Sequence, residues 1–253
     1  MVATLFTREH GRISALARGA RRSKRRFGGA LGPLTVSRFL LRGRTRGELW
    51  GLESAEVVHD YTRLAGDVGA YAHAGYVVEL LRELVPAEAP EPGLLDLVIA
   101  LHDSLVAGGP SPAALRAFEL RLLEVLGSAP QLDACVACGR DDQLDAGAVF
   151  DPGRGGVLCA TCAAHSRGPA VRPLPPGARA YLLAARDAVD LAEARALDDV
   201  PGADDGERAA ARVDHGLARD AVVGMIVDLL GRPLRSLEFI GKVQAAQRRG
   251  NEP

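Results

Sequence analysis

The first 58 residues alternate between apolar and polar side chains with the two-residue period of β-strands. Alternation or a short apolar run is found at residues 2–6, 13–17, 34–42 and 48–58. In the third run the apolar phase slips between Val36 and Phe39, which predicts a bulge or a strand that changes face. Short strands joined by glycine turns, with no helix between them, predict a small antiparallel β-barrel.

After His59 the apolar spacing lengthens to that of amphipathic helices. Apolar residues at 77, 80, 81 and 84 share one helix face. Ser111 followed by Pro112 is typical of a capped helix start, and Gly127 of a helix end. Further helices are expected over residues 94–106, 181–189 and 218–230, with an acidic connection at 198–207.

All four cysteines interrupt this helical region as two Cys-x-x-Cys pairs separated by twenty residues. Two such pairs at this spacing are typical of a tetrahedral zinc site, because each pair forms a tight turn that can point two thiolates at one ion. A complete set of four thiolates leaves no coordination position for catalysis. We therefore expect one structural Zn²⁺, bound by Cys135, Cys138, Cys159 and Cys162.

Other interpretations of the cysteines fit the sequence less well. A disulfide framework is typical of short secreted chains, and this chain has neither that length nor a signal-peptide pattern. A redox pair would be expected beside a βαβ pattern, whereas both pairs lie in loop-like sequence. His165 could replace one thiolate, but four sulfurs already complete a tetrahedral site.

Charge is distributed unevenly along the chain, although the formal net charge is only −1. Residues 1–50 contain twelve Arg and Lys against two acidic residues, and the remainder contains nineteen basic and thirty acidic residues. A strongly basic end on an otherwise acidic chain indicates an anionic partner for that end.

The densest positive charge lies at residues 18–29, between the second and third predicted strands. Arginine guanidinium groups fork onto phosphate oxygens, glycines allow close approach, and Phe27 could offer a stacking face. A solvated charge run is the ordinary alternative, but the position on a barrel favours nucleic-acid binding, through the backbone and without sequence preference. The candidate nucleic-acid-binding residues are Arg18, Arg21, Arg22, Lys24, Arg25, Arg26, Arg42, Arg44 and Arg46.

Enzyme and membrane functions find little support in the sequence. No apolar run of about 18 residues is present. The phosphate-binding G-x-x-x-x-G-K-[ST], the dinucleotide-binding G-x-G-x-x-G and the nucleophile elbow are all absent. We expect no catalytic activity. Two other classes stay open: a zinc-ribbon protein associated with RNA or the ribosome, and a zinc-containing nucleic-acid enzyme.

The stretches at residues 7–21, 25–31, 48–50 and 234–239, together with the four-cysteine insertion, resemble the RecO family of bacterial recombination mediators. Residues 7–21 (TREHGRISALARGAR) and 25–31 (RRFGGAL) are similar to the family's barrel segment. The ELW strand at 48–50, the four-cysteine insertion in a helical domain, and LRSLEF at 234–239 are also similar, so the resemblance covers nearly the whole chain.

The resemblance implies a DNA-repair protein of the RecF pathway, cytoplasmic and associated with the nucleoid. Family members bind single- and double-stranded DNA and anneal complementary strands. With RecR they help to load RecA onto DNA coated by single-stranded-DNA-binding protein. Carried over to this chain, the basic loop contacts DNA, and the cysteines are the zinc ligands of the zinc-bearing members.

The expected architecture is α+β and multidomain. It has an oligonucleotide-binding (OB) barrel at residues 1–59 and an α-helical domain at 60–253, with a zinc-finger insertion at 130–168. The family normally has about one further strand before Val2, so this barrel would lack its first strand. We expect that the start codon is assigned too late; the alternative is a barrel with an open seam, whose exposed edge would be a liability.

Overall fold

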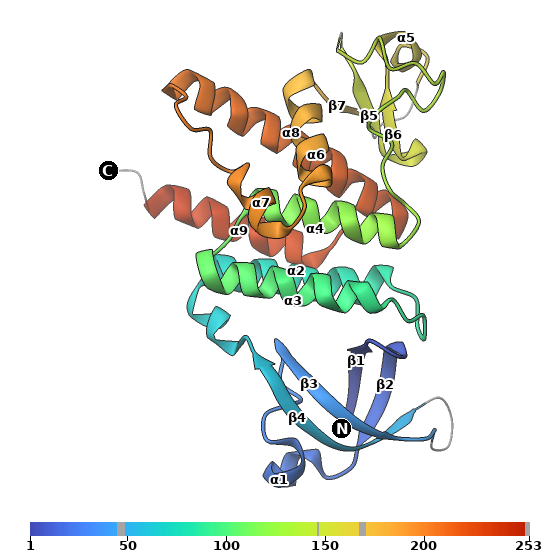
Figure 1. The fold of residues 1–253 in the computed structure, drawn as a ribbon, viewed down its shortest axis with the longest axis vertical. Coiled ribbons are helices and arrows are strands. Elements are labelled where there is room, and N and C mark those ends of the chain that lie inside the picture. Colours follow the sequence, from blue (N-terminus) through green and yellow to red (C-terminus); the bar gives the residue numbers. More distant parts are fainter. Residues whose placement is uncertain (45–48, 146, 167–170, 251–253) are drawn as a thin grey trace. The chain divides into compact units, whose positions relative to one another are not determined.

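A computed structural model describes residues 1–44, 49–145, 147–166 and 171–250 (Figure 1), without the side chains of residues 21, 24, 244 and 247–250. The chain forms two compact units, Met1–Pro110 with Arg235–Pro253, and Ser111–Leu234. The C-terminal segment therefore belongs to the same unit as the N-terminal strands. The domain limits expected from the sequence stay a prediction.

A four-stranded sheet occupies the N-terminal part of the first unit, in the order β1-β2-β4-β3. The sheet is antiparallel as predicted except for one pair, because β2 and β4 run parallel over Ala15–Trp50 to Ala17–Leu52. The ladder between β3 and β4 contains two register shifts, after Val36 and after Leu40, which confirms the predicted bulge. The strands are β1 (Val2–Thr7), β2 (Gly11–Ala17), β3 (Thr35–Arg42) and β4 (Trp50–Asp60).

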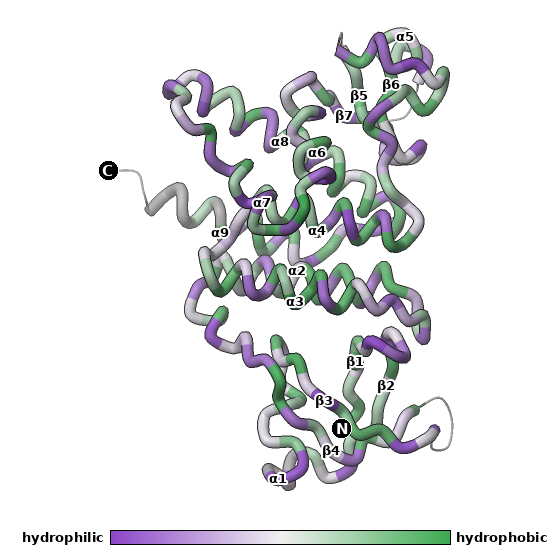
Figure 2. Tube along the Cα trace, viewed as in Figure 1, coloured by the Kyte–Doolittle hydropathy of each residue, from purple (hydrophilic) through white to green (hydrophobic). Residues whose placement is uncertain are grey.

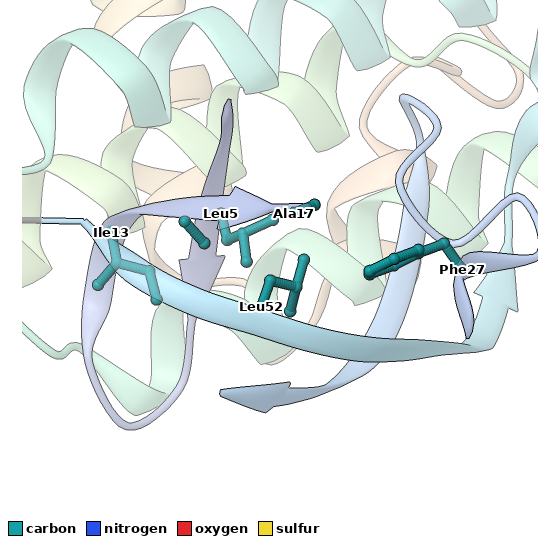
Figure 3. Close-up of a cluster of buried hydrophobic side chains, with 6 residues drawn as sticks. Leu5, Ile13, Ala17, Phe27 and Leu52 are labelled. Atoms are coloured by element: carbon teal, nitrogen blue, oxygen red, sulfur yellow. The ribbon is translucent and has the colours of Figure 1, made fainter. Parts of the chain in front are cut away.

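The core of this sheet is built from small and branched apolar side chains (Figure 3). Ile13, Ala15 and Ala17 alternate along β2 and are nearly inaccessible to solvent. Phe27 enters the same core from the loop between β2 and β3, and its side chain is 3% exposed. The sequence interpretation of Phe27 as a stacking face for DNA was therefore wrong, because the ring serves as an apolar anchor for the loop.

Three long helices follow in the first unit, and apolar residues recur along them (Figure 2). The carboxylate of Asp67 caps the first of these helices by accepting hydrogen bonds from the backbone N–H groups of Gly69 and Ala70. Pro92 begins the second helix, at a position where a missing N–H costs nothing. The helices are α2 (Val68–Leu84), α3 (Pro92–Gly108) and α9 (Arg235–Gly250).

A buried carboxylate joins α2 to the start of α9. Glu79 accepts hydrogen bonds from the backbone N–H groups of Arg235 and Ser236 and from the Ser236 hydroxyl. Burial raises the pKa of Glu79, but these hydrogen bonds outweigh burial and hold the pKa below its ordinary value. The charged form is therefore the stabilising one, and its contribution is lost as pH falls through the lowered pKa.

Replacing Glu79 with alanine is expected to lower the free energy of unfolding by about 1–3 kcal/mol at neutral pH, because three donors lose their acceptor. Glu124→Ala is the matched control, since Glu124 is an exposed glutamate on another helix. Urea unfolding at neutral and acidic pH measures the effect. The difference in the free energy of unfolding between Glu79→Ala and the wild type should decrease at acidic pH. A difference that does not depend on pH would contradict the role of the carboxylate.

The second unit combines a group of helices with a small sheet. Ser111 caps its first helix by accepting a hydrogen bond from the backbone N–H of Ala114, and Gly127 follows the end of that helix with a positive φ, both as predicted. The longest helix, over Asp205–Leu230, packs against the helices over Pro112–Val125 and Pro176–Asp187. The helices are α4 (Pro112–Val125), α5 (Ala160–Ala163), α6 (Pro176–Asp187), α7 (Leu191–Ala196) and α8 (Asp205–Leu230).

The acidic connection expected at residues 198–207 is shorter in the structure. Asp204 accepts from the backbone N–H of Glu207 while the Glu207 carboxylate accepts from the backbone N–H of Asp204, so the two residues form a capping box. Helix α8 therefore begins at Asp205, thirteen residues before the helix expected from residue 218. Its first half is largely polar, which hides it from a search based on apolar spacing.

The predicted fold class is confirmed: an N-terminal, largely antiparallel sheet and a helical region that includes a four-cysteine cluster. Among the described residues, no helix is both long and apolar enough to cross a membrane.

Candidate nucleic-acid interface and metal centre

The basic loop between β2 and β3 is folded locally and anchored at both ends. Gly19 adopts a left-handed backbone, which starts a 3₁₀ turn at Ala20–Arg22, and α1 (Lys24–Phe27) follows. The expectation that no helix lies between the strands was therefore wrong in this loop. Buried Ala17 precedes the loop and buried Phe27 closes it, so the arginines between them are held at the surface of the sheet.

One arginine of this loop stabilises the loop itself. Arg26 donates from Nη2 to the carbonyl oxygen of Arg18 at 2.9 Å and from Nε to the hydroxyl of Ser23 at 3.2 Å. Its guanidinium carbon also lies 5.1 Å from the centroid of the Phe27 ring. Arg26 is exposed and can still meet a phosphate, but part of its donor set is already used.

The other described arginine side chains of the loop are uncommitted. The side chains of Arg18, Arg22 and Arg25 are exposed, and none of these three side chains forms a hydrogen bond or ion pair within the described part of the chain. The loop sequence from residue 18 to 31 contains no acidic residue. The backbones of Arg21 and Lys24 lie in the same turn and helix, but the description does not extend to their side chains. The loop therefore presents positive charge without a counter-charge of its own.

The candidate arginines near the β3–β4 hairpin differ from those of the loop, because the protein already pairs them. Arg42 forms an ion pair with Glu53 at 2.6 Å, and Arg44 forms one with Glu88 at 2.5 Å. Both pairs are exposed, so each is worth little and could be exchanged for a phosphate. Arg46 lies outside the described residues. Their assignment to DNA stays a prediction.

Two further arginines of the basic N-terminal residues 1–50 connect the sheet to the helices of its own unit. Both guanidinium nitrogens of Arg8 bind the carboxylate of Asp96 on α3 at 2.6 Å, and Arg12 donates from Nε to the carbonyl oxygen of Val85. Sequence reasoning missed these contacts because Asp96 follows Arg8 by 88 residues. Part of the N-terminal positive charge therefore stabilises the fold.

The two cysteine pairs come together because the tight turn of the first pair, called its knuckle, lies beside a strand of the small sheet. Backbone hydrogen bonds from Val136 to Val157 and from Val157 to Gln131 align the first knuckle with β6 (Gly156–Leu158). The same sheet contains β5 (Val149–Asp151) and β7 (Arg172–Pro173), in the order β6-β5-β7. A side chain at Gly156 would meet the Gln131 carbonyl oxygen at 2.6 Å, so this close approach requires glycine.

The resulting sulfur geometry fits a tetrahedral metal ion. All four Sγ atoms lie within 4.8 Å of one another, and Cys138 Sγ is 3.9 Å from Cys159 Sγ. In a tetrahedral zinc site with Zn–S distances of ~2.3 Å, the sulfurs lie ~3.8 Å apart. His165 is exposed, and its Nδ1 hydrogen bonds with the Thr161 carbonyl oxygen. The four cysteines could therefore hold one metal ion, and a bound zinc would supply folding free energy rather than catalysis.

The thiol acidities are consistent with a metal centre. Burial raises the pKa of Cys135, but backbone N–H groups of Cys159, Ala137 and Cys138 outweigh it and lower the pKa to about 6. Hydrogen bonds to Cys159 and Cys138 raise the pKa of Cys162 to about 12. A bound cation would favour the thiolate form of all four cysteines.

The fold and these two sites define a class: an α+β protein with a basic loop suited to an anionic polymer and a four-thiolate cluster suited to a metal ion. Family comparison gives the particular family. The model for Recombination protein O N terminal matches residues 1–61, and the model for Recombination protein O C terminal matches residues 65–200. The chain therefore belongs to the RecO family of DNA repair and recombination proteins.

Curated relatives agree with this assignment along most of the chain. The DNA repair protein RecO of Anaeromyxobacter sp. (strain K) is 44% identical over 232 residues, which cover 91% of this chain and 90% of the relative. RecO of Anaeromyxobacter sp. (strain Fw109-5) is 41% identical over 96% of this chain and 89% of its own. RecO of Myxococcus xanthus (strain DK1622) is 34% identical over 95% of this chain and 89% of its own. The resemblance inferred from the sequence is confirmed.

Proposed function

We propose that this chain is a recombination mediator that binds single- and double-stranded DNA through the loop between β2 and β3. The observation that carries the proposal is that the side chains of Arg18, Arg22 and Arg25 are exposed and have no partner among the described residues. Several guanidinium groups on one acid-free loop repel one another, and phosphates relieve that repulsion. Contacts of this kind release condensed counterions and do not read sequence.

The proposed mechanism uses the loop to hold one strand by its phosphates, so that its bases remain free to pair. Neutralised phosphates repel a complementary strand less strongly, which accelerates annealing. The excess of acidic residues after residue 50 disfavours binding of DNA by the rest of the surface. The residues proposed to contribute are Arg18, Arg21, Arg22, Lys24, Arg25 and Arg26, with Arg42, Arg44 and Arg46 at the neighbouring hairpin.

Membership of the RecO family supports three further parts of the proposal. With RecR, the protein would help to load RecA onto DNA coated by single-stranded-DNA-binding protein. It would act in the cytoplasm at the nucleoid and carry out no catalysis. The metal would be one structural Zn²⁺, bound by the four cysteines, since four thiolates at this spacing match zinc better than harder cations.

The protein is expected to accelerate annealing of complementary oligonucleotides that are coated with single-stranded-DNA-binding protein. Fluorescence energy transfer between labelled strands measures the rate with and without RecR. Structured RNA, added at equal nucleotide concentration, should compete poorly with single-stranded DNA. An unchanged annealing rate, or displacement of the DNA by RNA, would contradict the proposal and favour the class of RNA-associated zinc proteins.

A further inference from the structure

The single tryptophan of the chain lies in a stack of three side chains on the first unit. The ring of His10, from the turn between β1 and β2, lies 4.7 Å from that of Trp50, with an angle of 30° between the ring planes. The guanidinium carbon of Arg44 lies 6.0 Å from the centroid of the Trp50 ring. The turn between β1 and β2, the first residue of β4 and a residue two positions after the end of β3 thus meet at one point.

Each member of this stack is positioned by a separate contact. The backbone N–H of His10 donates to the hydroxyl of Thr7, which in turn donates to the Gly11 carbonyl oxygen, so the turn is closed. Trp50 pairs with Ala15 in the parallel ladder. Arg44 is oriented by its ion pair with Glu88. The stack is therefore organised before any ligand arrives, which lowers the entropy cost of binding.

The exposure of the three side chains decides which surface is free. Trp50 is half-buried, whereas His10 and Arg44 are exposed. Trp50 covers one face of the imidazole, so the opposite face is available to a planar group. Arg44 places a positive charge beside Trp50, where a phosphate of the nucleic-acid backbone could be held. A flat aromatic face beside positive charge is the arrangement by which proteins bind single strands without sequence preference.

We propose that the exposed face of His10, supported from behind by Trp50, is a stacking platform for one unpaired nucleobase. This inference rests on the proposed DNA binding and adds to it a contact with a base, which the arginine loop does not supply. A base within a duplex is already stacked on both faces. The platform therefore selects single strands over duplexes, while the arginines bind both.

The test compares two oligonucleotides of equal length and charge, oligothymidylate and an abasic strand, by fluorescence anisotropy. The wild type should bind oligothymidylate about tenfold more tightly than the abasic strand. His10→Ala should remove that preference and leave abasic binding unchanged, whereas His10→Phe should retain it. His59→Ala is the matched control, since His59 is another exposed histidine stacked on an aromatic ring, that of Tyr61, in the same unit. Trp50 emission should respond to oligothymidylate and not to the abasic strand.

The outcomes separate this inference from the function on which it rests. If His10→Ala binds both strands as the wild type does, the proposed stacking platform is wrong, and the proposed DNA binding by the arginine loop is not affected. If the wild type binds neither strand, DNA binding itself fails and the platform fails with it. A His10→Ala protein that has lost its fold is recognised by its melting curve, and His10→Phe then decides, because loss of the base preference in a folded Phe variant overturns the proposal.

Discussion

Replacing Cys135 with serine is expected to cause the largest loss of stability of any single substitution considered. The Sγ of Cys135 is nearly buried and accepts a hydrogen bond from the backbone N–H of Cys159, so the change removes both a proposed metal ligand and a link between the two cysteine pairs. Structural zinc contributes roughly 10 kcal/mol or more of apparent free energy in small zinc domains. The substitution should therefore abolish stoichiometric zinc and lower the melting temperature of the second unit.

Metal analysis and calorimetry measure this effect, and a DNA-binding assay gives its second readout. Below the melting temperature of the variant, DNA affinity should stay within about twofold of the wild type, since the arginine loop belongs to the other unit. His165→Ala is the control and should keep its zinc, because His165 lies outside the sulfur cluster. A folded Cys135→Ser protein that loses DNA binding specifically would make the metal module part of the binding surface.

The second large effect is expected from the uncommitted arginines of the basic loop. Changing Arg18, Arg22 and Arg25 together to alanine should weaken single-stranded DNA binding by about 100-fold at low salt and abolish annealing, because three charged contacts to phosphate are removed. The same change should leave the melting temperature nearly unaltered, since these side chains have no partner within the described residues. Fluorescence anisotropy and thermal melting measure the two effects.

The matched control removes the same charge from another surface. Arg208, Arg212 and Arg219 are exposed on α8, and changing these three to alanine should leave DNA affinity within about twofold. Equal loss of affinity in the two triple variants would show that net charge, rather than the loop, determines binding.

The sequence predicted the features that depend on spacing within short segments. The two Cys-x-x-Cys pairs predicted the cluster because each knuckle is local and β6 brings the pairs together. The strand alternation and the slip in β3 predicted the sheet and its bulge, since side-chain period and register are set by neighbouring residues. The helix beginning at Pro112 was predicted because Ser111 carries its own cap.

The features that the sequence did not predict depend on partners that are distant along the chain. The burial of Phe27 was not predicted, and the residue was interpreted as a possible stacking face, because its place in the core depends on strands elsewhere in the chain. The ion pair of Arg44 and the capping of α9 by Glu79 join segments 44 and about 156 residues apart. The first half of α8 was missed because charged residues, alanines and glycines form most of it, so that its start is marked by a capping box and not by apolar spacing.

The salt dependence of single-stranded DNA affinity tests the central claim most directly. On a single strand, each phosphate contact contributes about −0.7 to the slope of log affinity against log salt concentration. Loss of Arg18, Arg22 and Arg25 should therefore make the slope shallower by about 2, while the α8 control keeps the wild-type slope. Parallel lines for the wild type and the loop variant would contradict the account, because they would place the phosphate contacts elsewhere on the protein.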